Sequence, residues 1–258
     1  MIEYFTVLNI VTYHIYHDGE IEKHIPQRIT IGFEKKYKYI YHDKDDNEHE
    51  VCIVDWHETN EKKIGKKSTV LSTKESIISD VNISEGQTTR RIRYKNGDIA
   101  EYGSNNGNTF WVLYKAKIDN IQLVRMPDEL NYTYNGIKIK YNFYNSERKY
   151  TCPGALTGFI GALAETGLKI VTTGSCFVYA SYFPSVEHIN GKSIDTLYLN
   201  DADEQKFINA MHKFNFNKQI TGKHKKKFDN AIQESKGTLH DSHLHSGFDE
   251  SLIKVIKT

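Results

Sequence analysis

Three short turn signals in the first half of the chain constrain its fold most. Asp18-Gly19, Asn96-Gly97 and Asn135-Gly136 each lie between segments in which apolar and polar residues alternate. Such dipeptides favour two-residue hairpin turns, and the alternation is typical of half-buried strands. A fourth hairpin, with a longer acidic turn, is expected within residues 37–57. We therefore predict a small all-β domain over residues 1–145, of unknown role.

The pattern changes after residue 145. Apolar residues at helical spacing predict a helix that ends near Gly167, and a second helix is expected over 201–214. Asp201 and Glu204 stand in the positions of a capping box at the start of that second helix. The residues that carry the first periodicity are Leu156, Phe159, Ile160 and Leu163.

The rest of this second region reads as short strands and one further helix. A short helix is expected over 225–235, ending near Gly237. Strands are expected at 168–181, 194–199, 238–245 and 252–256. We therefore predict an α+β fold class for the whole chain, in which residues 146–258 form an α+β domain with a small antiparallel sheet.

Composition excludes several classes of function. The 34 basic and 33 acidic residues leave a net charge of +1, so no overall field attracts the chain to nucleic acid or to an anionic membrane. The three cysteines, Cys52, Cys152 and Cys176, have no spacing typical of a disulfide framework or a cysteine-bound metal. The start of the chain lacks the pattern of a signal peptide, and no stretch of 18 apolar residues occurs, so synthesis in the cytoplasm is expected.

Three histidines lie within six residues near the end of the chain. His240, His243 and His245 belong to the segment "GTLHDSHLHSGF" at 237–248. On a strand, alternate residues face the same way, so His243 and His245 would project together while Leu244 packs behind them. Such a pair can bring two imidazoles to a metal ion, or one to the ion and one to its bound water.

Partners for these histidines are found upstream, in "SVEHINGKSIDTLYL". His188 and Asp195 flank a loop that contains Gly191, and Asp195 begins an apolar strand. A glycine in the loop allows a sharp turn, so both side chains can converge on one ion. Catalytic zinc sites usually have three protein ligands, of the histidine and carboxylate type, and one open position.

Together these residues resemble the LAS metallopeptidases, the group named for lysostaphin, D-Ala-D-Ala peptidases and sonic hedgehog. The pattern H-x2-G-x3-D followed by H-x2-H-x-H is closest in spacing to the penicillin-insensitive murein endopeptidases. The resemblance covers roughly residues 150–250 and implies a LAS-type fold for the second domain. It also implies a zinc enzyme that cuts amide bonds in peptidoglycan cross-link peptides, as a DD-endopeptidase does.

The resemblance assigns a role to each motif residue. His188, Asp195 and His245 would be the zinc ligands. His240 would be the general base, and His243 would stabilise the tetrahedral intermediate or orient the water. Relatives that trim a free carboxyl terminus often carry an arginine after the preceding strand. The corresponding stretch, 173–185, contains none, which favours internal cleavage.

A wall-directed enzyme without a signal peptide needs another route to its substrate. We expect an antibacterial effector loaded into a contact-dependent secretion machine, such as a type VI system, or a phage-type endolysin released by a holin. The effector version brings two partners, a component of the secretion machine and an immunity protein. The enzyme would act in the periplasm or cell wall. For an effector, this would be the periplasm or cell wall of a target cell.

Two alternatives remain open. The chain could be a non-catalytic binding or adaptor protein that keeps a peptidase fold. It could also be a cysteine-type peptidoglycan amidase, because Cys152 precedes a helix whose dipole lowers the pKa of a thiol, although a small buried residue explains Cys152 more simply. Six further histidines are interpreted as exposed strand positions rather than a second metal site: His14, His17, His24, His42, His49 and His57.

Overall fold

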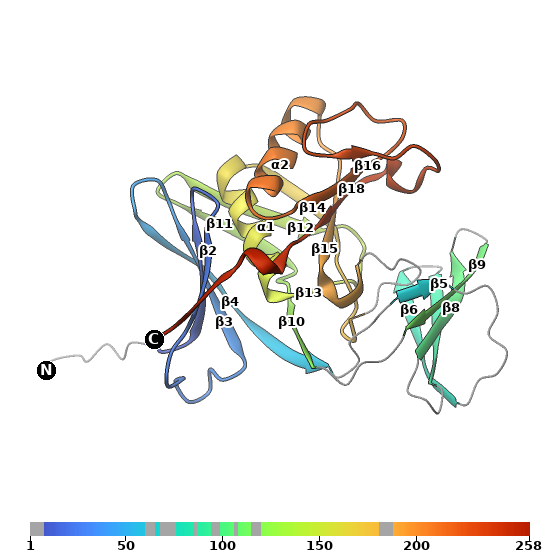
Figure 1. The fold of residues 1–258 in the computed structure, drawn as a ribbon, viewed down its shortest axis with the longest axis horizontal. Helices are drawn as coiled ribbons and strands as arrows, with labels where there is room; N and C mark the ends of the chain where they lie inside the picture. Colours follow the sequence, from blue (N-terminus) through green and yellow to red (C-terminus); the bar gives the residue numbers. More distant parts are fainter. Residues whose placement is uncertain are drawn as a thin grey trace, which may run out of the picture.

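The computed structural model describes residues 8–59, 65–67, 76–84, 87–93, 99–105, 108–114, 120–180 and 188–258. Within these ranges the chain forms three β-sheets and two α-helices (Figure 1). The predicted α+β class with a small antiparallel sheet is therefore wrong, because the protein is mostly β. The sheet that carries the histidine motif has seven strands and mixed direction. No helix in these ranges is long and apolar enough to cross a membrane.

The first sheet has seven strands in the order β13-β10-β4-β3-β1-β2-β19. Two predicted hairpins are confirmed here, β1 with β2 around Asp18-Gly19 and β3 with β4 around the acidic turn. Gly19 has a φ of 103°, which explains the need for glycine in the first turn. The strands are β1 (Val11–Tyr16), β2 (Ile21–Ile25), β3 (Lys36–His42), β4 (Glu48–Thr59), β10 (Ile121–Arg125), β13 (Tyr150–Thr151) and β19 (Lys254–Lys257).

The second sheet also has seven strands, in the order β11-β12-β14-β15-β18-β16-β17. The predicted hairpin around Asn135-Gly136 is confirmed as β11 and β12. Both strands precede residue 145 and yet belong to this sheet, whereas β19 joins the first sheet, so the sheets cross the expected boundary. The strands are β11 (Glu129–Tyr134), β12 (Ile137–Phe143), β14 (Lys169–Gly174), β15 (Ser193–Leu197), β16 (Lys218–Thr221), β17 (Ile232–Gln233) and β18 (His243–Gly247).

A third sheet of five strands has the order β5-β9-β8-β7-β6. Strands β7 and β8 pair antiparallel on either side of Asn96-Gly97, a dipeptide that itself lies outside the described residues. The strands are β5 (Gly65–Lys67), β6 (Ser76–Ser84), β7 (Gln87–Arg93), β8 (Ile99–Asn105) and β9 (Asn108–Tyr114).

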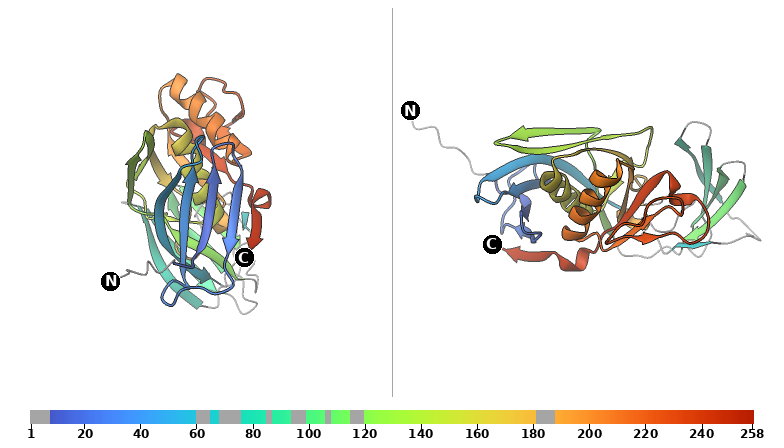
Figure 2. Two further views of the ribbon diagram at one scale, coloured as in Figure 1. Left: turned by 90° about the vertical axis from the view of Figure 1, so that its left-hand side faces the viewer. Right: turned by 90° about the horizontal axis from the view of Figure 1, so that it is seen from above.

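Helix α1 (Pro153–Thr166) lies between the first and second sheets (Figure 2). It is buried at every position except Glu165, so it forms the centre of one core shared by both sheets. Its predicted end is confirmed, since Gly167 adopts the left-handed conformation and its N–H donates to the carbonyl oxygen of Leu163 at 2.8 Å. Two glycines allow the C-terminal part of the chain to approach closely. A Cβ atom at Gly161 would lie 2.3 Å from the Phe214 ring, and one at Gly158 would lie 2.5 Å from the Phe214 carbonyl oxygen.

Helix α2 (Asp201–Lys213) packs against α1, and its predicted cap is wrong by one residue. The N-cap is Asn200, whose side chain accepts from the N–H of Asp203 at 3.1 Å. Asp201 is therefore the first helical residue. Glu204 reaches back instead, and its Oε2 atom accepts from the N–H of Leu199 at 2.8 Å.

Three other predicted segments differ from the structure. Residues 225–235 form turns followed by β17, not a helix, because the expected apolar face does not exist: Phe228 is buried but Ile232 is 65% exposed. The segment 238–245 begins with the 3-10 turn η2 (Leu239–Asp241) before β18 starts. The strand expected over 168–181 ends at Gly174. Two further 3-10 turns are η1 (Ile189–Gly191) and η3 (Glu250–Leu252).

Candidate metal centre

Two neighbouring strands of the second sheet bring three of the five motif residues together. Strands β15 and β18 pair antiparallel, with Asp195 opposite His245 and Leu197 opposite His243. Alternation along β18 places Leu244 on the other face, where it is fully buried in the core. The register of one strand pair therefore fixes the distance between a carboxylate and an imidazole.

His188 completes a group with Asp195 and His245, and it lies in the loop before β15, directly ahead of η1. Two consecutive residues in this turn, Asn190 and Gly191, have φ angles of 65° and 70°. The Gly191 carbonyl oxygen accepts from the N–H of Cys152 at 3.0 Å and from the Thr151 hydroxyl at 2.8 Å. A Cβ atom at position 191 would lie 2.5 Å from the Cys152 nitrogen, so only glycine fits. The predicted sharp turn is confirmed, and it is fastened to the start of α1.

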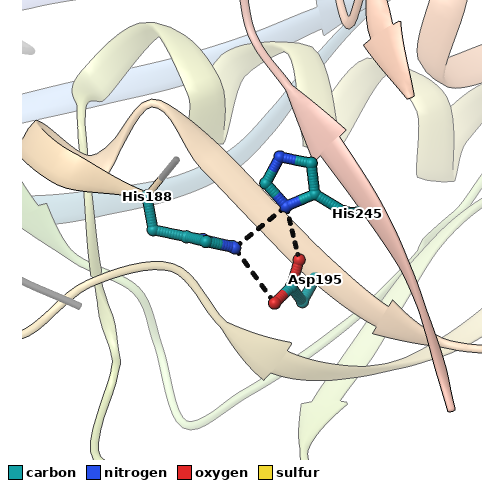
Figure 3. A group of neighbouring side chains, drawn as sticks. All are labelled: His188, Asp195 and His245. Carbon is teal, nitrogen blue, oxygen red and sulfur yellow. Dashed lines mark hydrogen bonds and ion pairs between the residues drawn. The ribbon is translucent and has the colours of Figure 1, made fainter. Parts of the chain in front are cut away.

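The donor atoms of His188, Asp195 and His245 converge (Figure 3). His188 Nε2 lies 3.0 Å from Asp195 Oδ2 and 3.0 Å from His245 Nδ1. His245 Nδ1 lies 3.1 Å from Asp195 Oδ1. Ligands at ~2.0–2.2 Å from a tetrahedral ion are separated by about 3.3 Å from one another. The three donors thus stand within a few tenths of an ångström of the spacing that an ion requires.

Burial and hydrogen bonding make these residues suited to an ion. All three are at most 2% exposed. His188 Nδ1 lies 3.2 Å from the Ser193 carbonyl oxygen, a contact that orients the ring so that Nε2 faces Asp195 and His245. His245 Nε2 is buried without a hydrogen-bond partner among the residues that the structure describes. This group could hold a metal ion, and the donors alone leave the kind of metal open.

The electrostatics of the group favour the protonation states that bind metals. Burial by itself would raise the pKa of the Asp195 carboxyl. The neighbouring imidazoles, above all that of His188, outweigh it and hold the pKa well below its usual range. Burial lowers the pKa of His188, and the Asp195 carboxylate only partly opposes this effect. An ionised carboxylate beside a neutral imidazole is the pair that metal coordination needs.

The other two motif histidines stand on the more exposed side of this group. The side chains of His240 and His243 are 12% and 17% exposed. His243 Nε2 lies 3.5 Å from Asp195 Oδ2, and the His240 ring centroid lies 5.3 Å from that of His243 and 5.7 Å from that of His245. The five residues therefore form one continuous cluster, with three donors inside and two imidazoles toward solvent.

The surroundings of His240 include two residues that the sequence motif does not contain. The Tyr198 hydroxyl donates to the His240 carbonyl oxygen at 2.8 Å and accepts from the N–H of Gly222 at 2.9 Å. Glu234 Oε2 accepts from the His240 backbone N–H at 3.4 Å and lies 3.5 Å from the His240 Nδ1 atom. Burial and the neighbouring His243 lower the pKa of His240. Glu234 falls in a segment expected to be helical, so no sequence signal marked it.

Arg148 is a further neighbour that sequence reasoning missed. Its guanidinium lies 5.5 Å from the centroid of the Phe177 ring, and its charge contributes to the lowered pKa of His188. The stretch 173–185, where some relatives carry an arginine, contains none. Residues 181–185 of this stretch lie outside the described ranges. Arg148 thus brings a positive charge near His188 from a segment that contains no motif residue.

Cys152 does not have the surroundings of an activated thiol. It is buried at the N-cap position of α1. Burial, followed by the charge of Glu250, raises the pKa of the thiol well above its ordinary value. The expected effect of the helix dipole is outweighed, which agrees with a structural role at the junction of β13 and α1.

No protein-family model, no curated protein and no solved structure matches this chain. The resemblance to LAS peptidases therefore rests on the five motif residues and their spacing.

Proposed function

We propose that this protein is a zinc-dependent hydrolase that cleaves an amide bond. The observation that supports this function best is the arrangement of the motif histidines. Three buried donors, His188, Asp195 and His245, stand beside two more exposed imidazoles, His240 and His243, in one cluster. A binding protein needs no such pair of additional bases beside its ion.

The donor set favours zinc among the common metals. Two imidazole nitrogens and one carboxylate form the three-ligand set typical of hydrolytic zinc sites, whereas calcium and magnesium prefer oxygen alone. When bound, such an ion acts as a Lewis acid and lowers the pKa of a water molecule. The residues around it then need only to orient that water and to move its proton.

We assign the proton transfer to His240. Its lowered pKa keeps the imidazole neutral near pH 7, so the ring can accept a proton from the attacking water and return it to the leaving amine. His243 lies beside the Asp195 carboxylate and faces the same side of the cluster. It is placed to donate to the oxygen that gains negative charge during attack.

For the substrate we propose peptidoglycan cross-link peptides, with cleavage inside the peptide. This assignment is supported by the H-x2-G-x3-D and H-x2-H-x-H spacing, which resembles that of murein endopeptidases. In an effector or endolysin the enzyme would act in the periplasm or cell wall, with an immunity protein and a secretion component as partners of the effector form. Toxicity confined to periplasmic expression would support that setting, and harmless periplasmic expression of a folded, zinc-loaded protein would contradict it.

The first experiment is digestion of purified peptidoglycan by four proteins, with zinc measured in each. They are the wild type, His188→Ala, His240→Ala and the control His212→Ala, which removes an exposed histidine of α2. We expect His240→Ala to keep the zinc of this centre and lose cleavage by roughly a hundredfold to ten-thousandfold. His188→Ala should lose both, and His212→Ala neither.

Three results would overturn the proposal. Wild type that cleaves without zinc, and is silenced by alkylation, would assign the activity to a cysteine. Zinc retention in His188→Ala at this centre, with undiminished cleavage, would remove that residue from the ligand set. Zinc-loaded wild type that cleaves no peptidoglycan would favour a binding or adaptor protein, the rival of a different class.

A further inference from the structure

Three histidines of the first sheet lie together on its outer face, far along the chain from the motif residues. They come from three adjacent strands, His14 on β1, His24 on β2 and His42 on β3. Glu22 of β2 and Ile40 of β3 lie directly opposite His14. His24 and His42 lie two residues further along their strands than these two residues. Alternation sends the residues between them inward, where Tyr13 and Tyr41 are buried in the core.

The imidazole of His14 is in contact with the rings of both His24 and His42. His14 Nδ1 lies 2.8 Å from His42 Nε2, so the two rings share one hydrogen bond. The His14 ring centroid lies 4.3 Å from that of His24 and 5.1 Å from that of His42. All three are half-buried, not exposed as the sequence suggested, because each ring covers the next.

A carboxylate stands at the edge of this cluster. Glu22 Oε2 lies 2.8 Å from His24 Nε2 and accepts from the Tyr16 hydroxyl at 3.2 Å. Its other oxygen, Oε1, accepts from Lys254 of β19 at 2.7 Å. These bonds hold the carboxylate beside His24, and Lys254 balances its charge.

The surroundings keep His14 and His42 neutral. Burial, together with the two neighbouring histidines, lowers the pKa of His14 to about 4. Burial also lowers the pKa of His42, against the acidic residues of the following turn. A neutral imidazole presents a lone pair, and lone pairs are what a transition metal binds.

We propose that His14, His24 and His42, with Glu22 beside them, form a second metal site for a first-row divalent ion such as Zn²⁺. For an ion to enter, the proton between the rings moves to the other nitrogen of its own imidazole, and the nitrogens of His14 and His42 separate only from 2.8 Å to about 3.3 Å. A His24 rotation toward His14 would supply the third nitrogen, from a ring 31% exposed and able to turn. The donors of the second sheet already lie within 4.8 Å of one another, whereas those of the first sheet reach such a spacing only after this rotation.

The test is zinc stoichiometry by equilibrium dialysis on four full-length proteins. They are the wild type, His14→Gln, His24→Gln and the control His17→Gln, which removes a histidine from the same hairpin outside the cluster. We expect wild type and His17→Gln to bind one more zinc per chain than His14→Gln and His24→Gln. This difference does not depend on the first centre, which contributes equally to all four proteins.

Cobalt provides a second, spectroscopic readout. Co²⁺ bound by three imidazoles absorbs in the visible range, so wild type should show a band component that His14→Gln and His24→Gln lack. Equal zinc uptake by all four proteins, with unchanged cobalt spectra, would overturn the second site. Should His14→Gln fail to fold, His24→Gln decides alone, because that ring is partly exposed and its loss leaves the core intact.

Discussion

The two histidine groups of this protein differ in how their donors are held. On the second sheet, a carboxylate stands between two imidazoles, and all three side chains are at most 2% exposed. On the first sheet, the His14 imidazole contacts those of His24 and His42 on the outer face, and the carboxylate of Glu22 lies at the edge. The group on the second sheet needs the turn at Gly191, whereas the group on the first sheet needs only three adjacent strands.

This difference shows what burial adds to a cluster of ligands. Inside the protein, an ionised carboxylate costs several kcal/mol unless positive charge or donors surround it. Asp195 is therefore stable only with its imidazole neighbours or with an ion, and the site is arranged before any ion arrives. On the outer face the imidazoles are only half-buried, so water compensates part of the same groups and fewer contacts hold the rings in a ligand geometry. We expect the buried group to bind metal more tightly and to be more sensitive to change.

The largest effect is expected for Asp195→Ala. The variant removes the only carboxylate of the buried group and the partner of two imidazoles. Zinc affinity of this centre should fall by more than about a hundredfold, and hydrolysis should fall with it. Metal analysis and cleavage rates measure both. Glu22→Gln is the matched change on the first sheet, and a similar loss of hydrolysis there would contradict the separation of the two groups.

Gly191→Ala tests whether the buried group depends on its loop. The change imposes a side chain at a φ of 70° and places a Cβ atom 2.5 Å from the Cys152 nitrogen. We expect a loss of about 2–4 kcal/mol in the free energy of unfolding, with weaker metal binding.

Gly32→Ala is the control for that experiment. Gly32 has a φ of 87° but no atom within 4 Å of an added Cβ, so it measures the backbone cost alone, about 1–2 kcal/mol. Chemical denaturation of both variants, with zinc titration, gives the comparison. Equal losses in the two variants would show that the close approach to Cys152 contributes nothing.

Glu204 sharpens the comparison, because it is a buried carboxylate and no imidazole of the described residues contributes to its pKa. It is 1% exposed, as Asp195 is, but burial raises its pKa to about 7. Below pH 4.5 both folded and unfolded states hold the proton. Above the ordinary pKa of 4.5 the unfolded state releases the proton, whereas the folded state keeps it until about pH 7, so stability declines by up to about 3 kcal/mol between these pH values and then levels off.

Glu204→Gln should remove this pH dependence. The variant keeps an oxygen that can accept from the Leu199 N–H, so the helix cap survives. The free energy of unfolding of the variant, relative to wild type, should rise between pH 5 and pH 8. Glu165→Gln makes the same charge change at an exposed position of α1 and should show no such rise. A parallel pH profile for wild type and Glu204→Gln would contradict the raised pKa.

The sequence predicts the local elements of this fold well and its assembly poorly. Turn dipeptides determine hairpins within a few residues, so those of Asp18-Gly19 and Asn135-Gly136 were predictable. Periodicity and Gly167 similarly predicted α1. The membership of β11 and β12 in the second sheet could not be predicted. Strand β12 pairs in parallel with β14 across a long connection, and such a pairing leaves no local signal in the sequence. The α+β expectation was wrong because the described part of the chain is mostly β, with three sheets and only two α-helices.

The candidate site shows the same division. The turn at Gly191 follows from a short motif and was predicted, whereas the register that pairs Asp195 with His245 was found only in the structure. Glu234 lies beside His240, and the charge of Arg148 acts on His188; both belong to segments without any motif, so only the folded chain brings them near the site. The clustering of His14 with His24 and His42 depends on which strands are neighbours. Alternation alone could not distinguish that cluster from scattered surface histidines.

The smallest effect concerns the cluster of the first sheet in the absence of metal. His14→Gln retains a side chain that can hydrogen-bond His42, so the metal-free protein should lose no more than about 1 kcal/mol in the free energy of unfolding. With zinc at about a hundred times the dissociation constant of the second site, wild type should gain about 2.7 kcal/mol that the variant does not. Thermal melts with and without zinc separate these quantities. A large metal-free loss would mean that the imidazole contacts serve the sheet itself, whereas a zinc-dependent difference alone means that the cluster is arranged for a ligand.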